Sequence, residues 1–395
     1  MKTAIVLIKS EYKKAYTGKL IIIFILVFLL LDCVNTYRND YLFKSREYMN
    51  IGRYELITQL EGELTEDKLA QISDKAELSK ELTASGGYSK EYDKDKYYSG
   101  YEYGDAQLWI ELSEKASALK EYSQKANEIA LAAKQKGAEL DDEYYIRSNK
   151  QIADRFSGRE ITALYNTDGF SHAFGVRFSS VLMIFLLMIG TCLSFTADRE
   201  TGMSEQISIS VKGGVQTSAA KIAAMMIFAF FISAVFFCCD MAMLFICTRP
   251  NGFSQPIYAV QGFEGSAFGM PIWCALFLIY ILRTVSMCTL GAVFLLLAKL
   301  SRNTFSAFAK IVLFTVICAV VSLMLTSQTG KAICCLDPIT LLQPKRLFEG
   351  FNVVRIFSQP VLLLHAALLG NALLFVIANT LNLLTDRRRN EAVKT

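Results

Sequence analysis

The sequence predicts an all-α, multi-pass membrane protein with six transmembrane helices and a large helical domain between the first two. Of its 395 residues, 53% are hydrophobic, and the mean hydropathy of +0.32 is higher than in an ordinary soluble domain. The apolar residues gather in charge-poor runs, whereas nearly every third residue of 37–172 is ionised. This segment contains no cysteine, which excludes a disulfide-stapled secreted domain.

A helix needs about 20 residues to cross roughly 30 Å of hydrocarbon. Six apolar runs come close to or exceed this length, at residues 20–34, 178–197, 222–247, 271–298, 305–326 and 361–384. The first run is a membrane anchor, because Asp32 stands where a lipoprotein cleavage box needs a small residue. Residues 1–19 are therefore expected to stay attached.

The distribution of charge predicts the orientation of the chain. Five lysines precede the first run, Arg387–Arg389 follow the last, and Lys299 and Arg302 lie between the fourth and fifth. Residues 37–172 carry 19 basic and 26 acidic groups, a net −7, which leaves +11 for the rest of the chain. The positive-inside rule then places both termini in the cytoplasm and residues 37–172 outside the cell membrane.

The predicted divisions are a cytoplasmic helix at 1–19, span one at 20–36, the outer domain at 37–172, and a transmembrane domain at 173–395. The last contains an inner loop at 198–221 and a cytoplasmic tail at 386–395.

Within 37–172 the pattern is helical. Apolar residues recur every three or four positions from Leu112 to Ala133, including Ile129, and Gly137 is expected to end this helix. Thr65-Glu66-Asp67 is typical of a second helix start, with Leu69, Ile72 and Ala76 on one face. The tyrosine- and glycine-rich segment 84–105 between them is expected to be a solvated connection, with an adaptable contact surface as the alternative.

Three ionisable residues interrupt the apolar runs: Asp240, Arg283 and His365. A charge at the centre of a bilayer costs roughly 2.5 to 3.5 kcal/mol on insertion scales, so pairing or function is the default. Because a short connection joins spans three and four, Asp240 and Arg283 are expected to be neighbours. The alternative is that Arg283 contacts an anionic substrate in a water-filled pathway. His365 is expected to pack between helices, and Cys334 and Cys335 to be free thiols, with a bond to Cys33 or Cys247 as the alternative.

The usual catalytic patterns are missing. The two histidines are not at metal-binding spacing, and there is no C-x-x-C, no G-x-S-x-G and no G-x-x-x-x-G-K-[ST]. The sequence therefore predicts no enzyme, no metal site and no nucleotide site in this chain, and no nucleic-acid partner. Any ATP and Mg²⁺ would be bound by another polypeptide.

The inner loop carries the most specific pattern. It begins with Asp198-Arg199-Glu200-Thr201-Gly202-Met203, continues to Gly213-Gly214, and ends at Lys221. This loop resembles the first intracellular loop of ABC-2 type transporter permeases, in which a span ends in an acidic residue and glycine, a short helix ends at a turn, and a lysine opens the next span. The resemblance implies that eight residues of this loop couple the permease to its ATPase: Asp198, Arg199, Glu200, Gly202, Met203, Gly213, Gly214 and Lys221. Lys212 departs from the small residue or proline that is common there.

Other segments extend the resemblance. Residues 1–18 are similar to the family's interfacial elbow helix, and the domain at 37–172 is similar to a long-ectodomain branch of Gram-positive bacteria. Residues 336–342 resemble its re-entrant or interfacial segment. The resemblance implies half of an exporter that pairs with a second copy or a related permease, contacts membrane lipids, and is driven by ABC ATPase subunits. Its substrate would be a peptide, an antimicrobial or a lipid-like compound.

Two other classes remain open. One is a membrane receptor or scaffold whose outer domain binds a ligand without transport. The other is an intramembrane enzyme, which the scarcity of histidines and of paired carboxylates in the spans disfavours. Co-purification of a nucleotide-binding partner would separate the permease from both.

Overall fold

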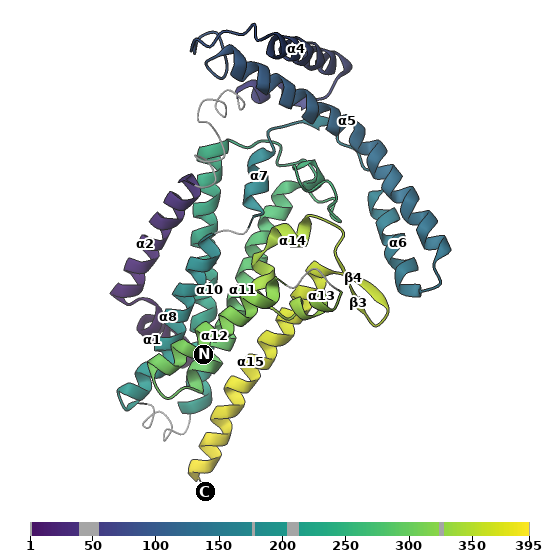
Figure 1. The fold of residues 1–395 in the computed structure, drawn as a ribbon. Coiled ribbons are helices and arrows are strands. Elements are labelled where there is room, and N and C mark those ends of the chain that lie inside the picture. Colours follow the sequence, from purple (N-terminus) through teal and green to yellow (C-terminus); the bar gives the residue numbers. More distant parts are fainter. Residues whose placement is uncertain (1, 39–54, 176–177, 204–212, 324–327, 395) are drawn as a thin grey trace.

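The computed structural model describes residues 2–38, 55–175, 178–203, 213–323 and 328–394. The chain is mostly helical, and among these residues six helices are long and apolar enough to cross a membrane, as predicted (Figure 1). They are α2 (Lys19–Asn35), α8 (Phe178–Glu200), α10 (Gly213–Thr248), α11 (Ile272–Lys299), α12 (Thr304–Ser322) and α15 (Leu363–Lys394).

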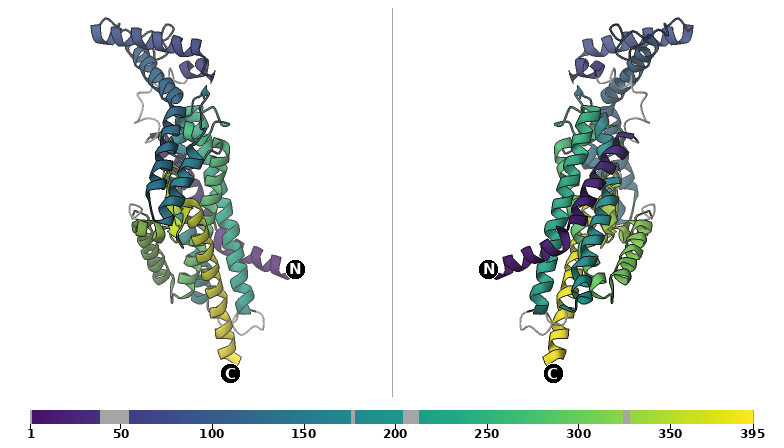
Figure 2. Two further views of the ribbon diagram at one scale, coloured as in Figure 1. Left: turned by 90° about the vertical axis from the view of Figure 1, so that its right-hand side faces the viewer. Right: turned by 90° about the vertical axis from the view of Figure 1, so that its left-hand side faces the viewer.

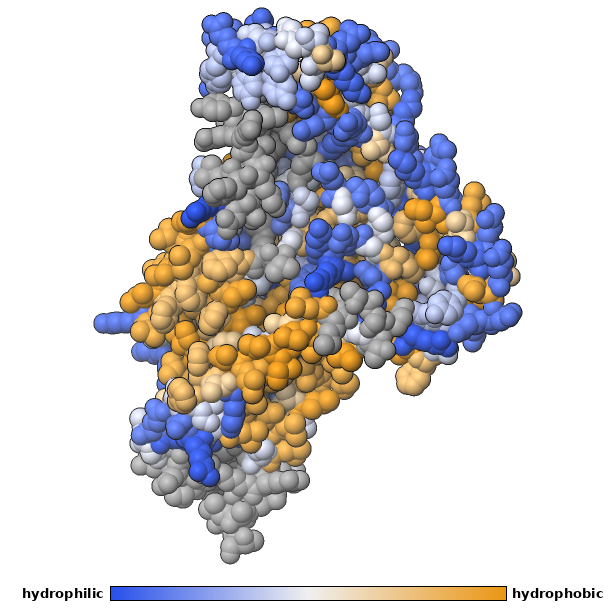
Figure 3. Space-filling model, viewed as in Figure 1, coloured by the Kyte–Doolittle hydropathy of each residue, from blue (hydrophilic) through white to orange (hydrophobic). Residues whose placement is uncertain are grey.

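Helices α8 and α11 form the centre of the bundle. Two-thirds of the most apolar window of each is buried (67%), against 17% for α2 and α12 and 22% for α15. The peripheral helices therefore turn apolar side chains outward. Figure 3 shows this apolar surface on one face of the bundle, with mostly hydrophilic residues over the domain above it. Such a broad exposed apolar surface is what a hydrocarbon environment requires.

Both ends of the chain lie toward the end of the bundle where α8 ends and α10 begins, called the termini end below (Figure 1). Helix α1 (Lys2–Tyr16) projects sideways there, away from the direction of α2 (Figure 2). Tyr16 is buried, and its ring stacks on Phe228 with centroids 4.5 Å apart. A Cβ at Gly190 would lie 2.4 Å from the Tyr16 ring, so the glycine is what allows α1 to pack on α8. Ile5 and Val6 remain exposed.

The opposite, domain end of the bundle carries the helical domain, residues 55–175. It contains α4 (Glu66–Ser85), α5 (Glu102–Glu139), α6 (Glu143–Phe156), α7 (Asp168–Ala173) and the short antiparallel strands β1 (Gly62–Glu63) and β2 (Ala163–Leu164). Helices α5 and α6 form a hairpin (Figure 1). Thr65 caps α4 by accepting from the Lys68 amide at 3.3 Å, as the sequence indicates.

Two details of this domain differ from prediction. Helix α5 begins at Glu102 and continues through Gly137 to Glu139, so the glycine does not end it. Ile129 is 43% exposed, and Ala130 is buried in its place. Segment 84–105 is irregular as far as Tyr101, but it is anchored: Asp105 accepts hydrogen bonds from the Ser99 amide and hydroxyl at 2.7 and 2.8 Å.

The connection between α12 and α15 enters the bundle. It comprises α13 (Gln328–Cys334), η3 (Pro338–Leu342), α14 (Pro344–Phe348) and the hairpin β3 (Val353–Ile356) and β4 (Gln359–Leu362). The Ser286 hydroxyl, near the middle of α11, donates to the Pro338 carbonyl at 2.8 Å. At Gly370 of α15 a Cβ would lie 2.2 Å from the Cys335 carbonyl oxygen, so only glycine admits this segment beside α15.

Several predicted span boundaries need correction. Residues 361 and 362 belong to β4, and the sixth helix begins at Leu363. The third begins at Gly213 rather than residue 222, so Gly213 and Gly214 lie in its first turn, and Lys221 is its ninth residue. Helix α12 ends at Ser322, and the predicted end of span five at residue 326 lies outside the described residues.

Candidate functional site

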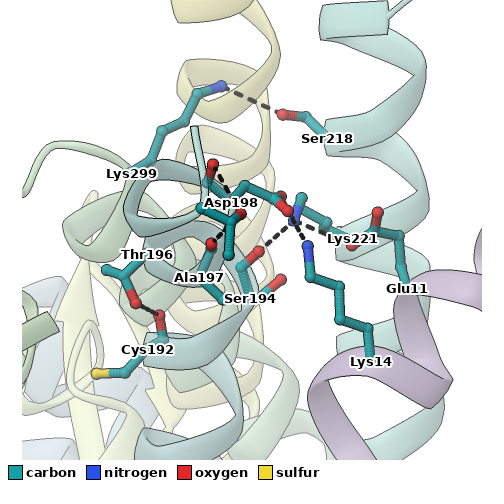
Figure 4. Close-up of polar contacts among 11 residues, drawn as sticks. Glu11, Lys14, Cys192, Ser194, Thr196, Ala197, Asp198, Ser218, Lys221 and Lys299 are labelled. Carbon is teal, nitrogen blue, oxygen red and sulfur yellow. Dashed lines mark hydrogen bonds and ion pairs between the residues drawn. The ribbon is translucent and has the colours of Figure 1, made fainter. Parts of the chain in front are cut away.

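Four charged side chains meet in the interior of the termini end (Figure 4). Lys221 of α10 lies 2.6 Å from Asp198 of α8 and 3.0 Å from Glu11 of α1, and Lys14 of α1 pairs with the second oxygen of Asp198. The Lys221 ammonium also donates to the Ser194 carbonyl. These four residues, Glu11, Lys14, Asp198 and Lys221, are called the charge cluster below.

Three of the four members of the charge cluster are deeply buried. The side chains of Lys221, Asp198 and Glu11 are 2%, 6% and 9% exposed, whereas that of Lys14 is 35% exposed. The Phe195 ring lies 4.8 Å from the Lys221 ammonium and adds a cation–π contact. Two carboxylates match two ammonium groups, so the cluster carries no net charge, and each ion offsets the desolvation of its neighbours. It joins α1, α8 and α10 at one point.

The two residues after Asp198 bind other helices. Arg199 donates to the carbonyls of Lys299 and Ser301, at the C-terminal end of α11, where a cation is favourable. Glu200 accepts from the Thr304 hydroxyl at 2.6 Å and from its amide at 3.3 Å, at the start of α12, where an anion is favourable. Three consecutive residues of α8 therefore form ion pairs or hydrogen bonds with four other helices, α1, α10, α11 and α12.

A second polar group extends this site. Lys299 donates to the Asn382 carbonyl of α15 and to the Ser218 hydroxyl of α10, the latter at 3.3 Å. The Asn382 amide in turn donates to the Ala292 carbonyl at 3.2 Å. The last turn of α11 is thus tied to α15 as well, so α8, α10, α11, α12 and α15 all have polar contacts within this end of the bundle.

The chain emerges from the bundle directly after these contacts. Thr201, Gly202 and Met203 are exposed, and Met203 is 48% accessible. Gly202 adopts φ +74°, a left-handed conformation that ends α8 and that side chains disfavour. The predicted short helix of the loop falls largely on 204–212, outside the described residues. Of the eight predicted coupling residues, Asp198 and Lys221 are buried, Arg199 and Gly214 are half-buried, Glu200, Gly202 and Met203 are exposed, and Gly213 begins α10.

Within the apolar part of the bundle, Asp240 and Arg283 form the predicted pair. The Arg283 guanidinium lies 2.8 Å from Asp240, and the Ser179 hydroxyl donates to the same carboxylate oxygen at 3.0 Å. Both charged side chains are at least 94% buried, with exposures of 6% and 1%. This contact joins α8, α10 and α11, the three spanning helices whose apolar windows are the most buried.

The remaining predicted residues have ordinary surroundings. The expectation that His365 packs between helices is wrong: it lies in the first turn of α15 with an exposed side chain, and its ring meets Phe268 of the α10–α11 connection edge to face at 6.4 Å. All ten cysteines are free thiols, and Cys334 and Cys335 are buried, as predicted. The Cys33 and Cys239 sulfurs lie 3.4 Å apart. Among the described residues no group of three or more His, Cys, Asp or Glu is arranged to hold a metal ion.

Sequence reasoning missed Glu11, Lys14 and Lys299 as members of this site. One signal was present for Glu11, because it is the single acidic residue among the first 19 positions, which otherwise carry five lysines. A lone carboxylate on a basic amphipathic helix indicates a specific partner rather than a solvated face.

Comparison with known proteins gives no further guide to this site. No family model, no curated protein and no solved structure matches the chain. The fold defines a helical membrane-embedded protein with six candidate spans, and its function must be inferred from the geometry above.

Proposed function

We propose that the chain is the permease subunit of an ABC-2 type exporter in the cell membrane, driven by separate ATPase subunits that bind ATP and Mg²⁺. The observation that carries this proposal is the run from Asp198 to Glu200. Each of these residues binds a different neighbouring helix, and the residues that follow are exposed. A force applied to the exposed segment is therefore transmitted to five helices besides α8 itself when Lys299 and its contact with α15 are included.

Coupling of ATP hydrolysis to transport needs both a surface on which the ATPase docks and a stiff connection from that surface to the transport pathway. Thr201–Met203 would supply part of that surface, while the charge cluster and the cap formed by Arg199 would supply the connection. In this proposal α1 is the interfacial elbow helix, α13 with η3 is the re-entrant segment, and the helical domain is extracellular. A second copy of the chain, or a related permease, completes the pathway within the lipid bilayer.

Affinity purification from native membranes should recover an ATPase with a phosphate-binding loop; a receptor or scaffold would recover none.

The orientation has a direct test. Ser89→Cys and Glu391→Cys are made separately in a background without the ten native cysteines, and intact cells are treated with a membrane-impermeant maleimide. We expect labelling at residue 89 only, because lysines and arginines flank the spans on the side of the two termini, and the positive-inside rule places that side in the cytoplasm. Permeabilised cells should label both positions, which controls for reactivity. Labelling of residue 391 in intact cells would reverse the topology.

Met203 offers the cleanest test of docking. Glu200 also holds Thr304, so its substitution would disturb α12, whereas Met203 is exposed and heads the segment expected to dock. We expect Met203→Asp to lower ATPase co-purification and permease-stimulated ATP turnover by about tenfold or more, since a charge would face an interface core. The thermal midpoint should stay within about 1 °C of the parent, as for surface substitutions in general.

Phe357→Asp is the matched control for Met203→Asp. Phe357 is 97% exposed on the β3–β4 hairpin, remote from the termini end, so the same change of an exposed apolar residue to aspartate should leave ATP turnover unaltered. Full turnover in the Met203 variant would remove residues 201–203 from the docking surface.

A further inference from the structure

A cleft of about 460 Å³ opens between α5 and the connection from α10 to α11, which contains the short helix η2 (Ile257–Ala259). This volume is in the range of sites that bind drug-sized ligands, about 300 to 1,000 Å³. One wall comes from the helical domain and the other from residues 258–264, which lead into a central helix of the bundle. Its lining residues are Glu111, Glu114, Lys115, Ala118, Leu119, Tyr122, Ile161, Tyr258, Ala259, Gln261 and Glu264.

The floor of the cleft is a rigid aromatic pair. The rings of Tyr122 and Tyr258 stack with centroids 5.0 Å apart and an interplanar angle of 11°. Arg159, 6% exposed, holds the pair from behind: it donates to the Ser266 carbonyl at 2.8 Å and to the Tyr122 hydroxyl at 3.4 Å. Its guanidinium also lies 4.8 Å from the Tyr258 ring. Burial raises the pKa of both phenols, so the two tyrosines themselves are uncharged at neutral pH.

The rim of the cleft is acidic. Three carboxylates, from Glu111, Glu114 and Glu264, face one ammonium group, that of Lys115, which donates to the backbone carbonyl of Tyr165 at 3.4 Å. The Gly262 amide donates to Glu264 at 3.0 Å and fixes its position. Glu114 and Glu264 lie on opposite walls and are exposed. The low-dielectric walls strengthen the negative potential between them.

We infer that this cleft binds a cationic amphipathic peptide. Its lysine or arginine side chains would meet Glu114 and Glu264, and one apolar or aromatic side chain would lie against Leu119 and the tyrosine pair. Apolar contact and cation–π attraction favour that floor, and the carboxylates supply the charge complementarity. A bound peptide would contact the domain and the α10–α11 connection at once. The inference goes beyond the transport proposal, because it needs no ATPase.

The test uses the purified full chain in nanodiscs of zwitterionic lipid. The probe is a fluorescein-labelled 12-residue peptide of alternating lysine and leucine with one tryptophan, and its partner has glutamine in place of every lysine. Empty nanodiscs give the lipid background. We expect saturable binding of the cationic peptide, weakened by salt, and at least tenfold weaker binding of the neutral one.

Three variants localise the binding. The double variant Glu114→Gln/Glu264→Gln should weaken binding about tenfold, and Ala118→Trp should abolish it by filling the cleft. Glu139→Gln, an exposed carboxylate at the far end of α5, is the matched control and should bind normally. Ala118→Ser controls for the change at that position. Equal binding of both peptides, or normal binding by Ala118→Trp, would overturn the inference, and either outcome would leave the docking tests at Met203 unaffected.

Discussion

Replacing Lys221 with methionine is expected to destabilise the folded chain by about 3 to 5 kcal/mol, the cost of breaking a buried ion pair. The substitution keeps the length of the side chain but removes the ammonium group that faces Asp198 and Glu11. Lys14 would remain on Asp198, so Glu11 is the carboxylate of the charge cluster that loses its counter-charge. Denaturation with increasing sodium dodecyl sulfate, followed by circular dichroism, measures the loss.

Two further variants separate the ion pairs from a simple packing defect. Lys310→Met removes a lysine that is exposed on α12 and should cost less than about 1 kcal/mol. Combining Lys221→Met with Glu11→Gln removes one charge of each sign and leaves the pair of Lys14 and Asp198 in place, so it should recover a large part of the loss, since uncompensated charge causes it. Stability equal to the parent in Lys221→Met, or a double variant less stable than the single one, would contradict the assignment.

The sequence predicts the six spans well because the membrane imposes a condition on composition alone. About 20 apolar residues are needed wherever a helix crosses, and the most apolar windows of all six helices satisfy this. The ends of the helices follow different physics. Helix α10 continues two turns beyond its apolar run to Gly213, because backbone hydrogen bonds do not stop at the membrane surface. Glycines at 213 and 214 are compatible with a helix start, which composition cannot distinguish from a stop.

The charge cluster could be predicted only in part. Asp198 and Lys221 were recognisable because they flank a short connection between two spans, so they must lie close in space. Their partners Glu11 and Lys14 are more than 180 residues away along the chain, and the packing of Tyr16 beside Gly190 and on Phe228 brings α1 to them. Helical periodicity gives the face of α1 that is apolar, but not the helix against which that face packs.

Ile129 of the helical domain illustrates a related limit. Its spacing matches the apolar face of α5, but the helix is 38 residues long, and its neighbours change along its length from α4 to α6. The buried stripe therefore shifts by one residue, from Ile129 to Ala130. Alanine suits the close approach of two helices, and isoleucine is left facing away from that contact.

Breaking the pair of Asp240 and Arg283 is the second large effect expected. Asp240→Asn and Arg283→Gln should each cost about 3 to 5 kcal/mol, because each breaks a buried ion pair with a separation of 2.8 Å. The double variant replaces both charges with amides that can still hydrogen-bond. It should be no less stable than either single variant, so the measured coupling should be about 3 kcal/mol or more.

Ser179→Ala provides the internal control for this cycle. Its hydroxyl donates to the same Asp240 oxygen at 3.0 Å, so its removal should cost about 1 kcal/mol while the ion pair stays intact. If Arg283 instead served an anionic substrate, Arg283→Gln would lower transport without lowering stability. The losses of transport in the two single variants would then simply add in the double variant. The same variants measured in both assays therefore decide the role of Arg283. Because the pair joins α8, α10 and α11 deep within the bundle, coupling in stability is the expected result, with transport lost in proportion to the unfolded fraction.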